Sequence, residues 1–223
     1  MPMYERRPRE VLTNQLVDRS APLCYLPPTS WLRTEVCGVA EQVDRRQALI
    51  RAAYSAIAER GFEGFRLRPI AAAAGIDHST LHHYFPTKED LIAAVLYHVT
   101  SQLEGTMRAD LAPGARLRHH LAAIATAMVE RPELFIVLDE FELRARRDAS
   151  MAANIRNDEK GWRDALVALF EEGIEQRTWS VDLDVHASVE LVIATLKGVR
   201  LRTDTAAAVV KQLCDLYSRG VSE

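Results

Sequence analysis

Apolar residues recur at helical spacing along most of the chain. Between residues 45 and 60, for example, Leu49, Ile50, Ala53 and Ile57 share one helical face, and Gly61 follows at the position that commonly ends a helix. No stretch of alternating apolar and polar residues stands out, and Gly and Pro are few. The pattern therefore predicts a fold built almost entirely from helices.

The same spacing predicts a series of helices in the second half of the chain. Pro113–Gly114, Pro132 and the polar stretch RRDAS punctuate them. We expect these helices at about 88–104, 115–130, 133–147 and 149–176, followed by two apolar stripes at 189–199 and 206–217. Helices of this number and length can form a bundle with one apolar core.

Two short helices joined by a tight turn are predicted between the first helix and these later ones. Gly75 can adopt the positive φ that the turn requires, and Asp77 is a suitable N-cap for a second helix at 78–84. Ala71 is small enough for the two helices to cross closely, with Leu81 filling the space between them. This is the spacing of a helix-turn-helix unit, whose second, recognition helix lies in the major groove of DNA.

Residues 45–96, RRQALIRAAYSAIAERGFEGFRLRPIAAAAGIDHSTLHHYFPTKEDLIAAVL, carry a more specific pattern than a helix-turn-helix alone. After the recognition helix, Thr87 is placed as the N-cap of the next helix, with Asp90 at the position of a capping box. This joint pattern resembles the TetR family of transcriptional regulators. The resemblance implies an all-α protein with an N-terminal three-helix DNA-binding head and a larger helical domain for effector binding and dimerisation.

The predicted domain boundaries follow from this resemblance. Residues 41–88 form the DNA-binding head, and residues 89–223 form the effector-binding and dimerisation domain. Residues 1–40 are an extension without a sustained helical stripe, and members of the family usually begin close to the first helix. We expect a disordered arm there; the alternatives are translation from a start codon that cells do not use, or a basic cluster at residues 6–9 that contacts DNA.

Candidate DNA contacts lie on and around the recognition helix. Side chains of its first turn reach base edges or phosphates, and two histidines lie one turn further on. The resemblance adds a phosphate contact from a lysine at the start of the next helix. It also shows two departures, since histidine replaces the usual phosphate-binding tyrosine and arginine replaces a usual Ser or Thr cap. The predicted DNA-binding residues are Arg66, His78, Ser79, Thr80, His82, His83 and Lys88.

The distribution of charge agrees with this placement. The whole chain has a net charge of −3, which argues against nucleic-acid binding over its entire surface. Residues 44–88 contain seven Lys and Arg against four Asp and Glu, whereas residues 89–223 contain sixteen against twenty-two. The net positive charge therefore accompanies the helix-turn-helix, as phosphate binding requires.

Two further sites are predicted in the larger domain. Large apolar side chains within the bundle are candidates for lining an effector pocket, with ordinary core packing as the alternative: Met128, Phe135, Phe141, Met151, Trp162 and Phe170. The resemblance implies that the two C-terminal stripes pair with a second copy of the chain, the alternative being that they complete the core of one chain. Their predicted interface residues are Val189, Val192, Ile193, Leu196, Val199, Val209, Val210, Leu213, Leu216 and Tyr217.

The sequence therefore predicts a homodimeric, ligand-responsive DNA-binding regulator. We expect a repressor of a palindromic operator on double-stranded DNA, released by a small-molecule effector; an activator, or a helical binding protein without specific DNA recognition, are alternatives. No enzyme is expected, because no G-x-S-x-G, glycine-rich phosphate loop or HExxH motif occurs. No cofactor, metal or membrane partner is expected either. Three scattered cysteines and the lack of a visible signal peptide suggest a cytoplasmic protein.

Overall fold

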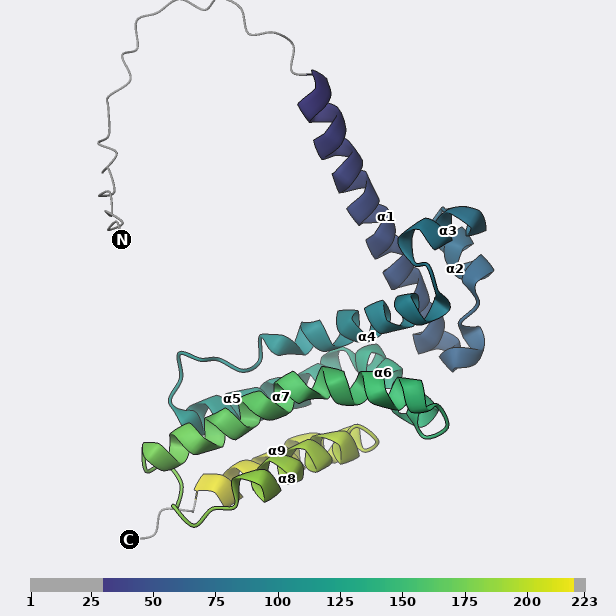
Figure 1. The fold of residues 1–223 in the computed structure, drawn as a ribbon. Helices are drawn as coiled ribbons and strands as arrows, with labels where there is room; N and C mark the ends of the chain where they lie inside the picture. The colour runs from purple at the N-terminus through teal and green to yellow at the C-terminus, as the bar shows by residue number, and fades with distance from the viewer. Residues whose placement is uncertain (1–29, 219–223) are drawn as a thin grey trace, which may run out of the picture. The chain divides into compact units, whose positions relative to one another are not determined.

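Helices dominate the computed structural model, which describes the backbone of residues 30–218 and the side chains of residues 42–217 (Figure 1). The elements in chain order are α1 (Ser30–Arg60), the 3₁₀ helix η1 (Gly61–Gly64), α2 (Leu67–Ala73), α3 (His78–Tyr84), α4 (Lys88–Glu104), α5 (Pro113–Glu130), α6 (Pro132–Ala145), α7 (Ala149–Glu175), α8 (Val185–Val199) and α9 (Thr203–Ser218). No β-strand occurs within the described range. The predicted all-α fold class is confirmed.

Helix α1 begins at Ser30, well before the predicted start at Arg45. The prediction depended on an apolar stripe, which the first part of α1 lacks. A helix can nevertheless extend from an existing nucleus without such a stripe, because propagation costs far less than nucleation. In the part of the predicted extension that α1 covers, the structure therefore has a helix instead of a disordered arm. Residues 1–29, with their basic cluster, lie outside the described residues.

The head is held together by buried side chains from α1, α2 and α3. Leu49 and Ile57 of α1, Ala71 of α2 and Leu81 of α3 are each at most 1% exposed. Burying an aliphatic side chain of this size contributes about 1.5–3 kcal/mol. Gly75 adopts a φ of +68° in the turn, as predicted. These contacts fix the direction of α3, so its remaining faces point away from the core.

The ends of the recognition helix α3 agree with the predicted bounds, but its cap differs. Asp77 occupies the N-cap position with extended backbone, yet its side chain makes no capping hydrogen bond. The Asp77 carbonyl instead accepts hydrogen bonds from the backbone N–H groups of Thr80 and Leu81, at 3.0 and 3.1 Å. The helix therefore begins at His78 through backbone bonds and through packing of its apolar face.

Helix α4 runs from the head into the larger domain. The predicted capping box is present at its start: Asp90 N donates to Thr87 Oγ1 at 3.1 Å, and Thr87 N donates to Asp90 Oδ2 at 3.0 Å. Leu91, Val95 and Val99 along the helix are fully buried. Because one continuous helix joins the two regions, its two ends move together unless the helix bends.

A second connection joins the head to α6. Phe62 N in η1 donates to Glu140 Oε2 at 3.2 Å, and the Phe62 ring meets the Phe141 ring edge-on, with 5.1 Å between centroids. The Arg144 guanidinium lies 4.8 Å from the centroid of the Phe62 ring, a cation–π distance. Three residues of α6 therefore hold the segment that leads directly into α2.

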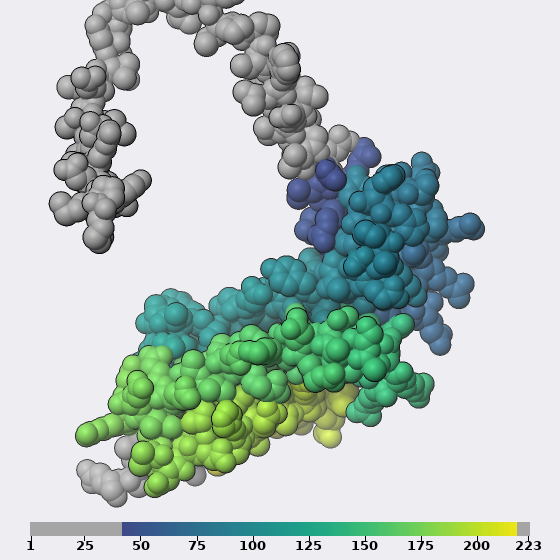
Figure 2. Space-filling model, in the orientation of Figure 1, coloured from purple at the N-terminus to yellow at the C-terminus, as the bar shows by residue number. Residues whose placement is uncertain are grey.

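The larger domain is a bundle of α5 to α9 packed with α4 (Figure 1). Helix α5 packs against α9, and α6 packs against α7, α7 against α8 and α8 against α9. In Figure 2 the yellow-green atoms of α8 and α9 form the lower edge of the view, beside the green atoms of α7. Buried apolar side chains form one continuous core through head and bundle. In the described part of the chain, no helix is long and apolar enough to span a bilayer.

Candidate DNA-binding surface, internal cavity and C-terminal helices

The face of α3 opposite Leu81 is polar and accessible. Ser79, His82 and His83 are exposed, and His78 and Thr80 are half-buried. The rings of His78 and His82 meet edge-on with 5.3 Å between centroids, because the two residues are one helical turn apart. The five predicted contacts on α3 thus lie on a helix whose exposed side chains can donate and accept hydrogen bonds.

Lys88 and Arg66 lie on either side of this helix in sequence. The Lys88 ammonium is 5.3 Å from the centroid of the Phe65 ring, a cation–π distance, and the side chain is half-buried at the first position of α4. Arg66 is exposed at the N-cap position of α2 and makes no capping hydrogen bond. Both cations are therefore accessible to a phosphate, although contact with DNA stays a prediction.

One cation of the head was missed by the sequence prediction. The Arg46 guanidinium in α1 lies 4.8 Å from the centroid of the Phe85 ring, directly after the recognition helix. Phe85 itself is 1% exposed. The packing fixes where Arg46 is held, and only the three-dimensional arrangement of α1 against the end of α3 could have shown it.

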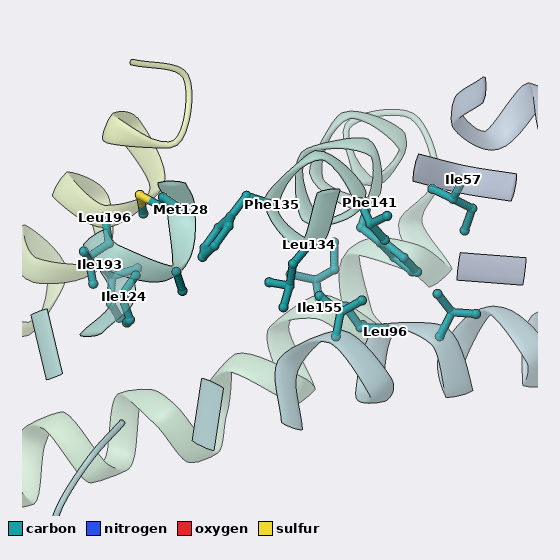
Figure 3. Close-up of a cluster of buried hydrophobic side chains, with 14 of the residues drawn as sticks. Ile57, Leu96, Ile124, Met128, Leu134, Phe135, Phe141, Ile155, Ile193 and Leu196 are labelled. Atoms are coloured by element: carbon teal, nitrogen blue, oxygen red, sulfur yellow. The ribbon is translucent and has the colours of Figure 1, made fainter. Parts of the chain in front are cut away.

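A cavity of about 630 Å³ lies in the larger domain between α4, α5, α6, α7 and α8. Four of the six predicted pocket residues line it: Met128, Phe135, Phe141 and Trp162. In Figure 3 Met128 lies close to Ile124, Ile193 and Leu196, whereas Phe141 lies on the side of the cluster nearest Ile57. The volume falls in the range of small-molecule sites. Occupation by an effector stays a prediction.

The other two predicted pocket residues lie elsewhere. Met151 is buried near the start of α7 and does not line the cavity. Phe170 packs against Trp179 and Tyr217, with ring centroids 4.7 and 5.1 Å apart. Trp179 approaches α7 so closely that a Cβ on Gly173 would lie 2.1 Å from its ring. The prediction failed for these two residues because helical spacing does not distinguish a cavity wall from solid core.

A hydrogen-bonded chain that includes the buried His120 and the half-buried Trp162 lies at one wall of the cavity. Trp162 Nε1 lies 2.9 Å from His120 Nε2, and His120 Nδ1 lies 2.8 Å from Thr106 Oγ1. Since the indole nitrogen can only donate, Nε2 of His120 accepts and its Nδ1 carries the proton. Thr106 in turn donates to Leu103 O at 2.6 Å. Burial, with a smaller effect from the charge of His119, lowers the pKa of His120 to about 4, so the ring is neutral at pH 7.

The same cavity has a charged wall that the sequence prediction missed. The Lys197 ammonium pairs with Glu142 at 2.7 Å and with Glu159. Burial alone would lower the pKa of Lys197, but these two carboxylates outweigh it and raise the pKa. Arg200 Nε lies 3.1 Å from Asp139 Oδ1. Both cations of the cavity wall are therefore already matched by carboxylates.

Asp158 and Glu104 also line the cavity and have no such match. Asp158 Oδ1 accepts a hydrogen bond from Thr100 Oγ1 at 3.2 Å, and neither carboxylate pairs with a cation among the described side chains. Burial raises the pKa of Asp158, the Thr100 hydrogen bond opposes this, and the charges of Glu159 and Glu104 add to the rise. This end of the cavity is therefore acidic.

The predicted interface residues of α8 and α9 lie mostly inside the single chain. Seven are at most 6% exposed: Val189, Val192, Ile193, Leu196, Val199, Val210 and Leu213. Val209 and Tyr217 are half-buried, and Tyr217 Oη donates to Ser188 O at 3.2 Å. Only Leu216 of the ten is exposed. The stripes that periodicity identified thus face the core, and this part of the prediction has to be corrected.

The opposite face of α8 is also apolar. Its exposed residues include Ala187, Leu191, Ala194 and Gly198, and Leu201 follows just beyond the helix. Leu191 and Leu201 are 48% and 75% exposed. A Cβ built on Gly198 would meet no atom within 4 Å. We call this set the outward face of α8. A helix that is apolar on both sides needs a partner on each side.

In the residues that the structure describes, no group of three or more His, Cys, Asp or Glu side chains could hold a metal ion. His78 and His82 contact each other, and His120 is engaged by Trp162 and Thr106.

The comparisons with known proteins agree on one family. Residues 49–95 match the family model described as bacterial regulatory proteins, tetR family. The transcriptional repressor NicS of Pseudomonas putida is 33% identical over 131 residues, covering 56% of this chain and 62% of that repressor. The repressor KstR2 of Rhodococcus jostii is 29% identical over 147 residues, covering 64% and 71% of the two chains. The alignment with NicS thus spans less than two thirds of that relative.

The fold agrees with the same family. The structure of the regulator FadR from Bacillus subtilis in complex with stearoyl-CoA superposes with a TM-score of 0.67, at 21% identity over 79% of this chain and 99% of that one. The matched segment 49–95 falls within residues 45–96, on which the resemblance was based. The comparisons therefore support the resemblance to the TetR family of bacterial transcriptional regulators, and residues 49–95 carry it.

Proposed function

We propose that this chain is a homodimeric, ligand-responsive transcriptional repressor. Residues 41–88 bind DNA, and residues 89–223 bind an effector and a second copy of the chain. The observation that carries the proposal is the polar, exposed face of α3 on a basic head, directly joined to a bundle that contains a cavity. Relatives named as transcriptional repressors support the choice of repressor over activator.

On DNA, α3 enters the major groove and its first turn contacts base edges. His78, Ser79 and Thr80 are placed for base or phosphate contacts, and His82 and His83 for contacts one turn further along the groove. Lys88 and Arg66 bind phosphates and position the helix. A single head makes few base contacts, so a dimer on an inverted repeat is needed for specific binding.

The dimer forms through the outward faces of α8 and α9. Leu191, Leu201 and Leu216 would otherwise leave large apolar side chains in water on neighbouring helices, 48%, 75% and 55% exposed. Gly198 fits a close helix crossing, because nothing in its own chain requires a glycine there. The proposal keeps the predicted helices but assigns the contact to the residues that face outward.

Effector binding in the cavity changes the direction of the heads. Phe141 lines the cavity and also contacts Phe62 of η1, while Glu140 on the same helix holds the Phe62 backbone. Helix α4 adds a second connection, since it begins at Lys88 in the head and contributes cavity residues up to Glu104. A ligand that displaces α6 or α4 thus alters the spacing of the two recognition helices.

A binding selection from random DNA tests the proposal. The purified chain is expected to enrich an inverted repeat, and operator binding is then measured by band shift together with mass by analytical ultracentrifugation. Leu191→Glu should give a folded monomer with weakened operator binding. Val129→Glu, which places the same charge at a 68% exposed apolar position of α5, outside α8 and α9, serves as the control. Enrichment of no sequence would contradict specific recognition, and a dimer that survives Leu191→Glu would place the interface elsewhere.

A further inference from the structure

The charge on the cavity wall restricts the kind of ligand that fits there. Four carboxylates line the cavity, from Glu104, Glu142, Asp158 and Glu159, against two cations, Lys197 and Arg200. Lys197 pairs with Glu142 and Glu159, and Arg200 with Asp139 and more distantly with Glu142. The cations are therefore used within the protein, and the excess negative charge is located at Asp158 and Glu104.

The acidic end is formed by one face of α4 and one face of α7. Tyr97, Thr100 and Glu104 lie at spacings of three and four residues on α4, and Asp158 and Trp162 lie one turn apart on α7, so each set shares a helical face. The Thr100–Asp158 hydrogen bond joins the two faces. Two aromatic side chains and two unpaired carboxylates thus line the same part of the cavity, at its solvent-accessible mouth, because Tyr97 is 63% exposed and Glu104 is also exposed.

The remaining wall is apolar. Leu103, Met107, Ile124, Phe135 and Leu196 are among the side chains that line it. A ligand that fits both parts has an apolar body and a positively charged group at the Asp158 end. Carboxylates attract such a group directly, and aromatic rings attract ammonium ions through their faces.

We propose that the effector is an amphipathic organic amine, whose ammonium group is bound between Asp158 and Glu104 and whose apolar body fills the cavity. This inference rests on the proposed function, because it names the ligand class of the same cavity. An anionic ligand of the same shape is disfavoured by the excess of carboxylates. A neutral ligand gains the apolar contacts but not the charge interaction.

The alternative with the best local support is an anion bound at Arg200. Its side chain is 10% exposed, and its Nε atom has no hydrogen bond of good geometry despite lying near Asp139. An anion there would have to compete with Asp139 and Glu142 for the same guanidinium. The experiment therefore includes an anionic probe and a variant of Arg200.

Three probes with one apolar body separate these possibilities: 4-phenylbutylamine, 4-phenylbutanol and 4-phenylbutanoate, titrated into the full chain by calorimetry at pH 7. The amine should bind most tightly and the carboxylate least tightly. Asp158→Asn should weaken amine binding about tenfold or more, the usual effect of losing a hydrogen bond to a charged group, and leave the alcohol unchanged. Asn keeps an oxygen for Thr100, so the variant is expected to fold, which thermal melting checks.

Asp164→Asn is the matched control, because Asp164 is an exposed carboxylate on the same helix that pairs with Lys160 outside the cavity. Tighter binding of the carboxylate, especially if Arg200→Gln abolishes it, would overturn the proposal. So would equal effects of the two Asp variants, or binding of none of the three probes. Operator binding by the ligand-free chain is measured in parallel. If it persists while the amine fails, the ligand class is wrong and the regulator function stands.

Discussion

Helices α3 and α8 each bury one face in the core, but they differ in the face that points away from it. The outward residues of α3 are polar: Ser79, His82 and His83. Those of α8 include Leu191 and Gly198. In α3 the outward side chains offer hydrogen-bond donors and acceptors, which suit DNA. In α8 they offer apolar surface and a site for close approach, which suit another helix. The chemistry of the outward face thus indicates the kind of partner.

The inward and outward faces of α8 can be separated by matched substitutions with very different expected effects. Leu196 is 3% exposed, so Leu196→Glu places an unpaired carboxylate in the core and should cost more than about 4 kcal/mol of unfolding free energy. Leu191→Glu on the same helix should leave the helical content near wild type while dissociating the dimer. Circular dichroism and ultracentrifugation on the same samples measure both effects. Similar behaviour of the two variants would remove the distinction between the faces.

The inward face of α3 gives the next largest effect. Leu81 is fully buried between the helices of the head, and Leu81→Ala should lower the unfolding free energy by about 2–5 kcal/mol. DNA binding should fall on every sequence, because the recognition helix loses its support. His83→Ala on the exposed face of the same helix is the control and should leave thermal stability nearly unchanged. Denaturant unfolding and band shifts measure the two properties separately. Loss of affinity without loss of stability would contradict this explanation.

This comparison also shows how much could be predicted from sequence. In the head, short helices with a single apolar face allowed the bounds of α3, the turn at Gly75 and the capping box at Thr87 to be predicted correctly. In α8, apolar residues occur on both faces, so periodicity found the inward stripe and assigned it to the dimer. Only the three-dimensional structure shows which face of α8 is buried in the core of its own chain.

The residues that line the cavity were predicted only in part, because helical periodicity does not show which apolar side chains border a cavity. Large apolar side chains are visible in a sequence, but whether they border empty space depends on how distant helices meet. Phe135 borders the cavity, while Phe170 fits against Trp179 in solid core. The polar wall could not be predicted at all, because Asp158 and Glu104 belong to helices far apart in the sequence and acquire a shared role only where α4 meets α7.

The buried histidine of the bundle, His120, allows a test by pH. The pKa of His120 is lowered from its usual 6.5 to about 4, so below pH 6.5 the unfolded chain binds a proton that the folded chain does not. The contribution of neutral His120 to the free energy of unfolding is therefore fully present above pH 6.5. It is lost as the pH falls toward 4, by about 3 kcal/mol at most. His120→Asn should flatten this part of the pH profile in denaturant unfolding, compared with wild type. Identical profiles for wild type and His120→Asn would contradict the assignment.

The smallest expected effects distinguish positioning from sequence recognition on the head itself. Lys88→Ala removes one cation from a phosphate-binding position, so affinity should fall alike on all DNA sequences and the dependence of log affinity on log salt should lose about one charge. Thr80→Ala should instead change the preferred base within a half-site, by about 1–3 kcal/mol for a direct contact. Band shifts at several salt concentrations, on the selected operator and on variants with single base changes, measure both.

A change of base preference in Lys88→Ala with an unchanged salt dependence would move Lys88 to the base-contacting group. A uniform loss in Thr80→Ala would move Thr80 to the phosphate. Either result would change the proposed division of roles between α3 and the start of α4.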